Sequence, residues 1–219
     1  MPKSQVLLFA VFLFLGKPAS EAASLGPVLP QDPESRPQLK PAKEETPEWM
    51  RPWLQEIGAM IGYGLAHEIF GTRDGRRQYL ILNPRWGMFL TGVIGKVPYK
   101  GALEFLVEPI AMFQFEPNNR YALGLSALLR YNFWTPSRRV TPFFDAGGGV
   151  MWTNLGLPDL GSNFNFQLQF GPGLHVHFNR GTALTFQYRF HHISNAETAK
   201  PNFSINSSLL LIGVTFFLL

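Results

Sequence analysis

The sequence predicts an all-β protein, an eight-stranded antiparallel transmembrane β-barrel of the outer membrane. Apolar and polar residues alternate in segment after segment, which is the period of a strand with two unlike faces. The apolar face is rich in aromatic residues, with 20 Phe in 219 residues, and only 16% of all residues are charged. A mean hydropathy of +0.01 is the average expected when a lipid-facing face alternates with a polar one.

The chain opens with the pattern of a secretory signal peptide. Lys3 precedes the apolar run Val6–Leu15, and small residues follow around Ala19–Ala23. We therefore expect a signal peptide over residues 1–22, because the apolar run is too short to cross a bilayer as a helix. A retained membrane anchor is the alternative.

A proline-rich stretch follows over residues 23–52. It contains seven prolines with mixed charges between them, and proline at this density supports neither helix nor sheet. We expect an extended, mobile periplasmic linker.

Alternation from Trp53 to Leu219 defines the barrel, residues 53–219. A soluble β-sandwich also alternates, but here the polar face carries opposite charges among small residues, which suits the filled interior of a small barrel. The charged set is Glu104, Glu108, Arg130, Asp145 and Arg189. Eight strands leave no channel, which disfavours transport. The expected strands are 56–65, 79–93, 103–116, 121–133, 142–152, 163–178 and two within 182–219.

Connection lengths orient the barrel. The connections at 95–100, 136–139 and 179–181 are short, whereas 71–75, 154–158 and 196–205 are mostly longer. After a signal peptide and a periplasmic linker, the short set is expected in the periplasm and the long set outside; 117–119 is a short exception.

The seventh strand carries the candidate chemistry. His192 and Ser194 share the face of Phe186, Tyr188 and Phe190, so we expect both to face lipid near the outer end of the strand. An imidazole two residues from a hydroxyl can accept its proton and allow the serine to attack an ester carbonyl. Asn206, on the last strand, has the parity to face the same side and orient the imidazole.

The residues around this pair resemble a known family. The motif His192–Ala196, the pair Pro201–Asn202 and the run Asn206–Ser208 precede an apolar last strand. This order resembles the lipid A 3-O-deacylase family, eight-stranded outer-membrane barrels that hydrolyse the ester-linked acyl chain at position 3 of lipid A with a Ser-His-Glu triad. The resemblance implies an esterase active toward the outer leaflet, with lipopolysaccharide as its partner.

The same resemblance assigns roles to individual residues. It implies that His192 is the general base, that Ser194 is the nucleophile, and that Asn195 or Asn202 is the oxyanion donor. The chain departs from the family pattern at Asn206, which stands where the triad Glu is expected, and at Glu197, which stands where the family has Gly. Asn206 brings no charge to an imidazolium, and Glu197 is an alternative acid. A catalytically degenerate or structural barrel is therefore the rival interpretation.

Composition excludes other classes of function. The chain has no Cys, so it offers no thiolate metal ligand and no Cys nucleophile. Its Lys and Arg form no basic stripe, which disfavours nucleic acid as a partner. His175 and His177 share an inner face, but hydrogen bonding inside the barrel is the favoured role for them. No metal and no cofactor are expected.

Overall fold

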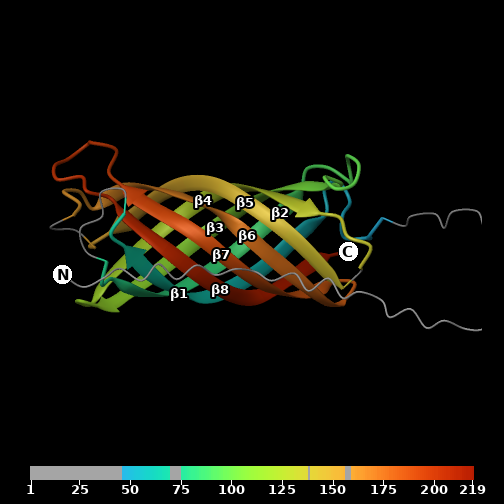
Figure 1. Cartoon of the computed structure of the whole chain (residues 1–219), viewed down its shortest axis with the longest axis horizontal. Coiled ribbons are helices and arrows are strands. Elements are labelled where there is room, and N and C mark those ends of the chain that lie inside the picture. The colour runs from blue at the N-terminus through green and yellow to red at the C-terminus, as the bar shows by residue number, and fades with distance from the viewer. Residues whose placement is uncertain (1–45, 70–74, 138, 156–158) are drawn as a thin grey trace, which may run out of the picture. The chain divides into compact units, whose positions relative to one another are not determined.

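The computed structural model describes residues 46–69, 75–137, 139–155 and 159–219. It confirms the expected fold class, because all eight strands pair antiparallel and close into one barrel (Figure 1). The strands are β1 (Gln55–His67), β2 (Gln78–Phe89), β3 (Gly101–Glu116), β4 (Arg120–Phe133), β5 (Val140–Thr153), β6 (Phe164–Asn179), β7 (Thr182–Ser194) and β8 (Ile205–Leu218). Among these residues, no helix is long and apolar enough to cross a membrane. The expected signal peptide and residues 23–45 of the expected linker lie outside the described residues.

The observed strands follow the predicted alternation, with one clear difference. β2 ends at Phe89 and does not continue to Val93 as expected. The N–H groups of Leu90 and Thr91 both donate to the carbonyl of Leu103. Since a regular ladder gives each N–H its own acceptor, this shared carbonyl marks the end of regular pairing.

The two faces of the barrel differ as predicted. Aromatic and aliphatic side chains that point outward are exposed, whereas the intervening polar side chains are buried inside. The outward set includes Phe113, Leu123, Leu125, Leu129, Phe144, Phe164, Phe166, Leu168, Phe170, Phe186, Tyr188, Leu210, Ile212 and Phe216. Such a surface suits a hydrocarbon environment, because exposure of a continuous apolar band to water is unfavourable.

Two arginines organise the interior charges. Arg130 lies 3.3 Å from Glu56, 3.7 Å from Glu104 and 3.1 Å from Asp145. Arg189 pairs with Glu108 and lies 3.2 Å from the same Asp145 carboxylate. The predicted interior network is therefore confirmed. Because all these side chains are removed from solvent, each charge depends on its partners for compensation.

Residues just before β1 close one end of the barrel. We call this end, where Leu219 lies, the C-terminal end, and the opposite one the long-loop end (Figure 1). Trp49 and Met50 are buried there, and the Trp49 ring stacks on His177 with centroids 4.5 Å apart. It also contacts Phe217 at 5.3 Å. Packing therefore begins before Trp53, within the part of the chain assigned by sequence to the linker.

The interior network generates a prediction on stability. Replacing Arg130 by Met leaves Glu56, Glu104 and Asp145 without a shared cation, and breaking a buried pair in this way costs about 3 kcal/mol or more. We expect Arg130→Met to lower the urea midpoint of the refolded barrel, measured from its heat-modifiable mobility in gels.

Arg180→Met is the matched control. It removes an arginine that pairs with Glu48 at 3.0 Å on the surface, where an ion pair contributes little to stability. An equal loss of stability in the two variants would contradict a structural role for the interior network.

Candidate active site on the outer face

The candidate residues gather on the outward face near the long-loop end. His192 of β7 lies directly opposite Asn206 of β8, and Ser194 is the last residue of β7. His192 and Ser194 are both half-buried and share the outward parity of Phe186 and Tyr188. Strand pairing alone thus brings the imidazole and the amide together, because directly opposed residues place their side chains on the same face.

Asn206 binds the imidazole through a defined atom. Its Oδ1 lies 2.7 Å from His192 Nδ1, while its Nδ2 donates to the carbonyl oxygen of Ile69 at 2.9 Å. A carbonyl can only accept, so the NH₂ group of the amide must face Ile69 and the oxygen must face His192. The hydrogen in the 2.7 Å contact with Asn206 is therefore carried by His192 Nδ1. The other nitrogen, Nε2, then keeps its lone pair and can act as a base.

Ser194 lies on the same face as His192 but is not yet bonded to it. Two residues apart on a strand, their Cα atoms are separated by roughly 7 Å. Within the described residues, the Ser194 hydroxyl makes no hydrogen bond to the His192 ring. Catalytic hydrogen bonds are often long in the absence of substrate and shorten when it binds. Phe166 of β6 lies opposite Ser194 and flanks the pair.

The loop after Ser194 has a constrained backbone. Ala196 and Glu197 have φ values of +51° and +63°, which costs an L-residue about 1–2 kcal/mol each. The carbonyl of Asn195 holds this conformation by accepting from both the N–H and the hydroxyl of Thr198. Glu197 therefore occupies a left-handed position, where Gly would be free of strain.

The two asparagines predicted as oxyanion donors play different parts in this loop. Asn195 is buried, and its Nδ2 donates to the carbonyls of Ala199 and Pro201, so its side chain organises the loop. The Asn195 backbone N–H donates to Asn202 Oδ1 at 3.0 Å. Among the described residues, Asn202 Nδ2 donates to Glu197 Oε1 at 3.3 Å, in an exposed contact. The Asn202 amide nitrogen can therefore leave its contact more easily than the buried Asn195 amide nitrogen, which donates to two carbonyls.

Glu197 is not brought to the imidazole. Its carboxylate accepts from Asn202, and His192 Nδ1 is already bonded to Asn206. The structure thus places Asn206, and not the alternative acid, beside the histidine.

A second loop supports the first. A β-bridge joins Leu160 to Asn202, and the Phe203 N–H donates to the carbonyl of Asp159 at 2.9 Å. The carboxylate of Asp159 forms a buried ion pair with Arg77, just before β2. Arg77 also donates to Gln114 Oε1 at 3.0 Å. The position of Asn202 therefore depends on an arginine more than 120 residues away in the chain.

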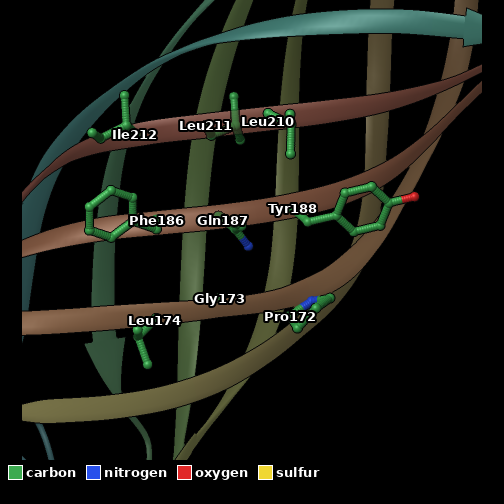
Figure 2. A pocket seen from close by; sticks show the side chains of 9 residues that line it. All are labelled: Pro172, Gly173, Leu174, Phe186, Gln187, Tyr188, Leu210, Leu211 and Ile212. Carbon is green, nitrogen blue, oxygen red and sulfur yellow. The ribbon is translucent and has the colours of Figure 1, made fainter. Parts of the chain in front are cut away.

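An apolar groove lies on the outer face, and Figure 2 shows the side chains that line it. From Tyr188 it extends away from His192, toward the C-terminal end. It has a volume of about 500 Å³ and spans β6, β7 and β8. Tyr188 lies at its end nearer to His192. The pairing of β6 with β7 lapses at Gly171 and Pro172 and resumes at Gly173, because proline has no N–H to donate. The groove is lined by Pro172, Gly173, Leu174, Phe186, Gln187, Tyr188, Leu210, Leu211 and Ile212.

The inner histidines make hydrogen bonds inside the barrel. His175 Nδ1 lies 2.9 Å from Thr185 Oγ1, and His177 Nε2 lies 3.2 Å from Thr141 Oγ1. In the part of the chain that the structure describes, no three His, Cys, Asp or Glu residues are placed to hold a metal ion.

Some residues near the site were not predicted from the sequence. Ile69, Arg77 and Asp159 act through contacts across loops, which carry no periodic signal. His67 was missed because the first strand was expected to end at Leu65. Its outward parity with Ile61, Tyr63 and Leu65 was a usable signal, since a histidine is unusual on a lipid-facing stripe.

Comparison with known proteins identifies similar barrels. The family model described as "Lipid A 3-O-deacylase (PagL)" matches residues 61–215. Among solved structures, the outer membrane enzyme PagL is 21% identical with a TM-score of 0.53, covering 72% of this chain and 97% of that one. Neisserial surface protein A is 17% identical with a TM-score of 0.56, covering 74% and 96%. No sequence among the curated proteins matches this chain.

The Asn206 amide generates a prediction on the histidine tautomer. We expect long-range ¹H–¹⁵N spectra of histidine-labelled barrel to show His192 protonated at Nδ1 and unprotonated at Nε2. Asn206→Leu removes the acceptor and should abolish this preference, whereas the spectrum of His175, which has its own partner in Thr185, should not change. A native His192 protonated at Nε2 would contradict the assignment.

The Arg77–Asp159 pair generates a prediction on loop dynamics. Arg77→Met leaves a buried carboxylate without its cation, so the two loops should open more often. We expect the amide hydrogens of Gly161 and Phe203 to exchange about tenfold faster, measured by mass spectrometry. Arg139→Met, at an exposed position, is the control. Unchanged exchange in Arg77→Met would rule out this coupling.

Proposed function

The chain belongs to the lipid A 3-O-deacylase family, and on this premise we propose that it hydrolyses an ester-linked acyl chain, that at position 3, from lipid A in the outer membrane. The observation that carries the proposal is the outward-facing row of His192, Asn206 and Ser194 beside an apolar groove. A polar, base-bearing site on a lipid-facing surface suits a substrate that is itself part of the membrane.

The reaction proceeds through an acyl-enzyme. Substrate binding rotates the Ser194 hydroxyl toward His192 Nε2, which takes its proton as Ser194 Oγ attacks the ester carbonyl. The C–O bond to the sugar breaks, and the leaving oxygen receives that proton from Nε2. Water, deprotonated by the same nitrogen, then releases the fatty acid and restores Ser194.

Asn206 orients the base in this mechanism. Its Oδ1 holds the Nδ1–H tautomer, as the bond to Ile69 requires. It supplies hydrogen-bonding geometry but no negative charge, so the imidazolium formed in each step is stabilised less than it would be by a carboxylate. We therefore expect a slower enzyme than one with an acidic third residue.

Asn202 is the proposed oxyanion donor. Its Nδ2 gives up the exposed 3.3 Å contact with Glu197 and donates to the carbonyl oxygen as that oxygen gains charge. The role of Asn195 in this proposal is indirect, because its amide organises the loop that carries Asn202.

The groove is the proposed path of the acyl chain. Tyr188 at its near end is four residues from His192 along β7, or about 13 Å. A chain whose ester lies at Ser194 would run down the outer face past Phe190 and enter the groove. Its apolar walls match a hydrocarbon tail.

This function fixes the proposed orientation. Lipid A lies in the outer leaflet, so the long-loop end, which carries His192 and Ser194, faces outward and the C-terminal end faces the periplasm. The expected signal peptide over residues 1–22, followed by the expected periplasmic linker over residues 23–52, agrees with this route of export.

The rival function is that of a structural barrel that has lost its chemistry. Two observations favour it, namely the uncharged Asn206 and the lack of a hydrogen bond between the described side chains of His192 and Ser194. Both proposals require the same fold, so activity must decide between them.

Mass spectrometry of lipopolysaccharide after incubation with the refolded barrel distinguishes the deacylase from the structural barrel. We expect the native chain to remove one hydroxyacyl mass and Ser194→Ala to slow this at least about a thousandfold. Ser137→Ala, on an exposed connection at the C-terminal end, is the matched control and should retain the native rate. No mass loss in the native chain, with loss appearing in Asn206→Glu, would establish the structural barrel instead.

A further inference from the structure

A second serine–histidine pair lies on the outward face, apart from His192 and Ser194. Ser208 of β8 is half-buried, opposite Phe190 of β7 and Leu65 of β1. Its Oγ lies 2.7 Å from His67 Nε2 and 3.0 Å from the hydroxyl of Tyr188. Three neighbouring strands thus direct three polar groups to one point on an apolar surface.

The three groups have complementary hydrogen-bonding capacities. The Ser208 hydroxyl can donate its hydrogen to the lone pair of His67 Nε2 and still accept from the Tyr188 hydroxyl. A serine bonded to a histidine nitrogen at 2.7 Å has the geometry of an activated nucleophile. Ser194 makes no such bond to His192 among the described residues, so this second serine is the one already placed against a base.

Its position is deeper in the membrane than the first site. Ser208 is two residues from Asn206 along β8, or roughly 7 Å, toward the C-terminal end. Tyr188 both bonds Ser208 and lines the groove, and Leu210, the next outward residue of β8, lines it too. An acyl chain attached at Ser208 would therefore enter the groove at once.

We propose that Ser208, His67 and Tyr188 form a second ester-cleaving site, which acts on a membrane-lipid ester that lies deeper in the leaflet than the one reached by Ser194. Ser208 Oγ forms a bond to the carbonyl carbon as its proton passes to His67 Nε2. The carbonyl oxygen becomes an oxyanion and accepts the Tyr188 O–H. The ester C–O bond then breaks and the leaving alkoxide takes the proton from Nε2. Water, deprotonated at Nε2, hydrolyses the acyl-Ser208 and releases a fatty acid.

A serine-reactive fluorophosphonate with a long alkyl chain tests the site. The full chain is refolded as Ser194→Ala, so that only other serines can react, and the folded, heat-modifiable band is digested and sequenced by mass spectrometry. We expect an adduct on Ser208. In the double variant Ser194→Ala/His67→Gln, the rate of labelling at Ser208 should fall at least tenfold. In Ser194→Ala/Tyr188→Phe, a milder change, it should fall several-fold.

Three outcomes would overturn the proposal. They are no adduct on Ser208 in the folded Ser194→Ala barrel, an adduct that His67→Gln leaves unchanged, and equal labelling of the exposed Ser137, which has no histidine partner among the described contacts. Labelling of Ser194 in the native chain is read from a different peptide, so failure of this second site is distinguishable from failure of the proposed deacylase.

Discussion

Closure of the sheet is the constraint on which the rest of this structure depends. In a bilayer, an unpaired strand edge leaves N–H and C=O groups without partners at a cost of several kcal/mol each, so the last strand must pair with the first. That pairing places β8 between β7 and β1. Asn206 consequently has His192 on one side and His67 on the other. The polar groups of the outer face are brought together by the same hydrogen bonds that close the barrel.

Closure also creates an interior that must be filled. Eight strands enclose only enough space for side chains, and here much of that space is occupied by arginines and carboxylates arranged around Arg130 and Arg189. A charged interior and an apolar exterior invert the usual arrangement of a water-soluble sheet protein. Beyond this wall, Asn202 on a loop is held by a few specific contacts.

Features that depend on the two-residue period of a strand could be predicted from the sequence. Contacts that depend on pairing between distant segments could not. Alternation located the strands, their two faces and the outward parity of His192 and Ser194, because each is a local property of the backbone. The bond between Asn206 and Ile69 joins positions 137 residues apart, and that between Ser208 and His67 joins positions 141 residues apart. Such contacts follow from register and loop conformation, which alternation does not encode. The expected strand over 163–178 ran through Pro172 without interruption, and the groove beside that residue also needs β7 and β8.

The residues before β1 that close the C-terminal end offer a way to follow assembly. Trp49 contacts Phe89 of β2, His177 of β6 and Phe217 of β8. Trp49 precedes β1 and contacts rings on β2, β6 and β8, so its complete set of ring contacts requires both edges of the sheet to be brought together, as they are in the closed barrel. In a chain whose other four tryptophans are replaced, the emission of the Trp49 indole would report closure of the barrel.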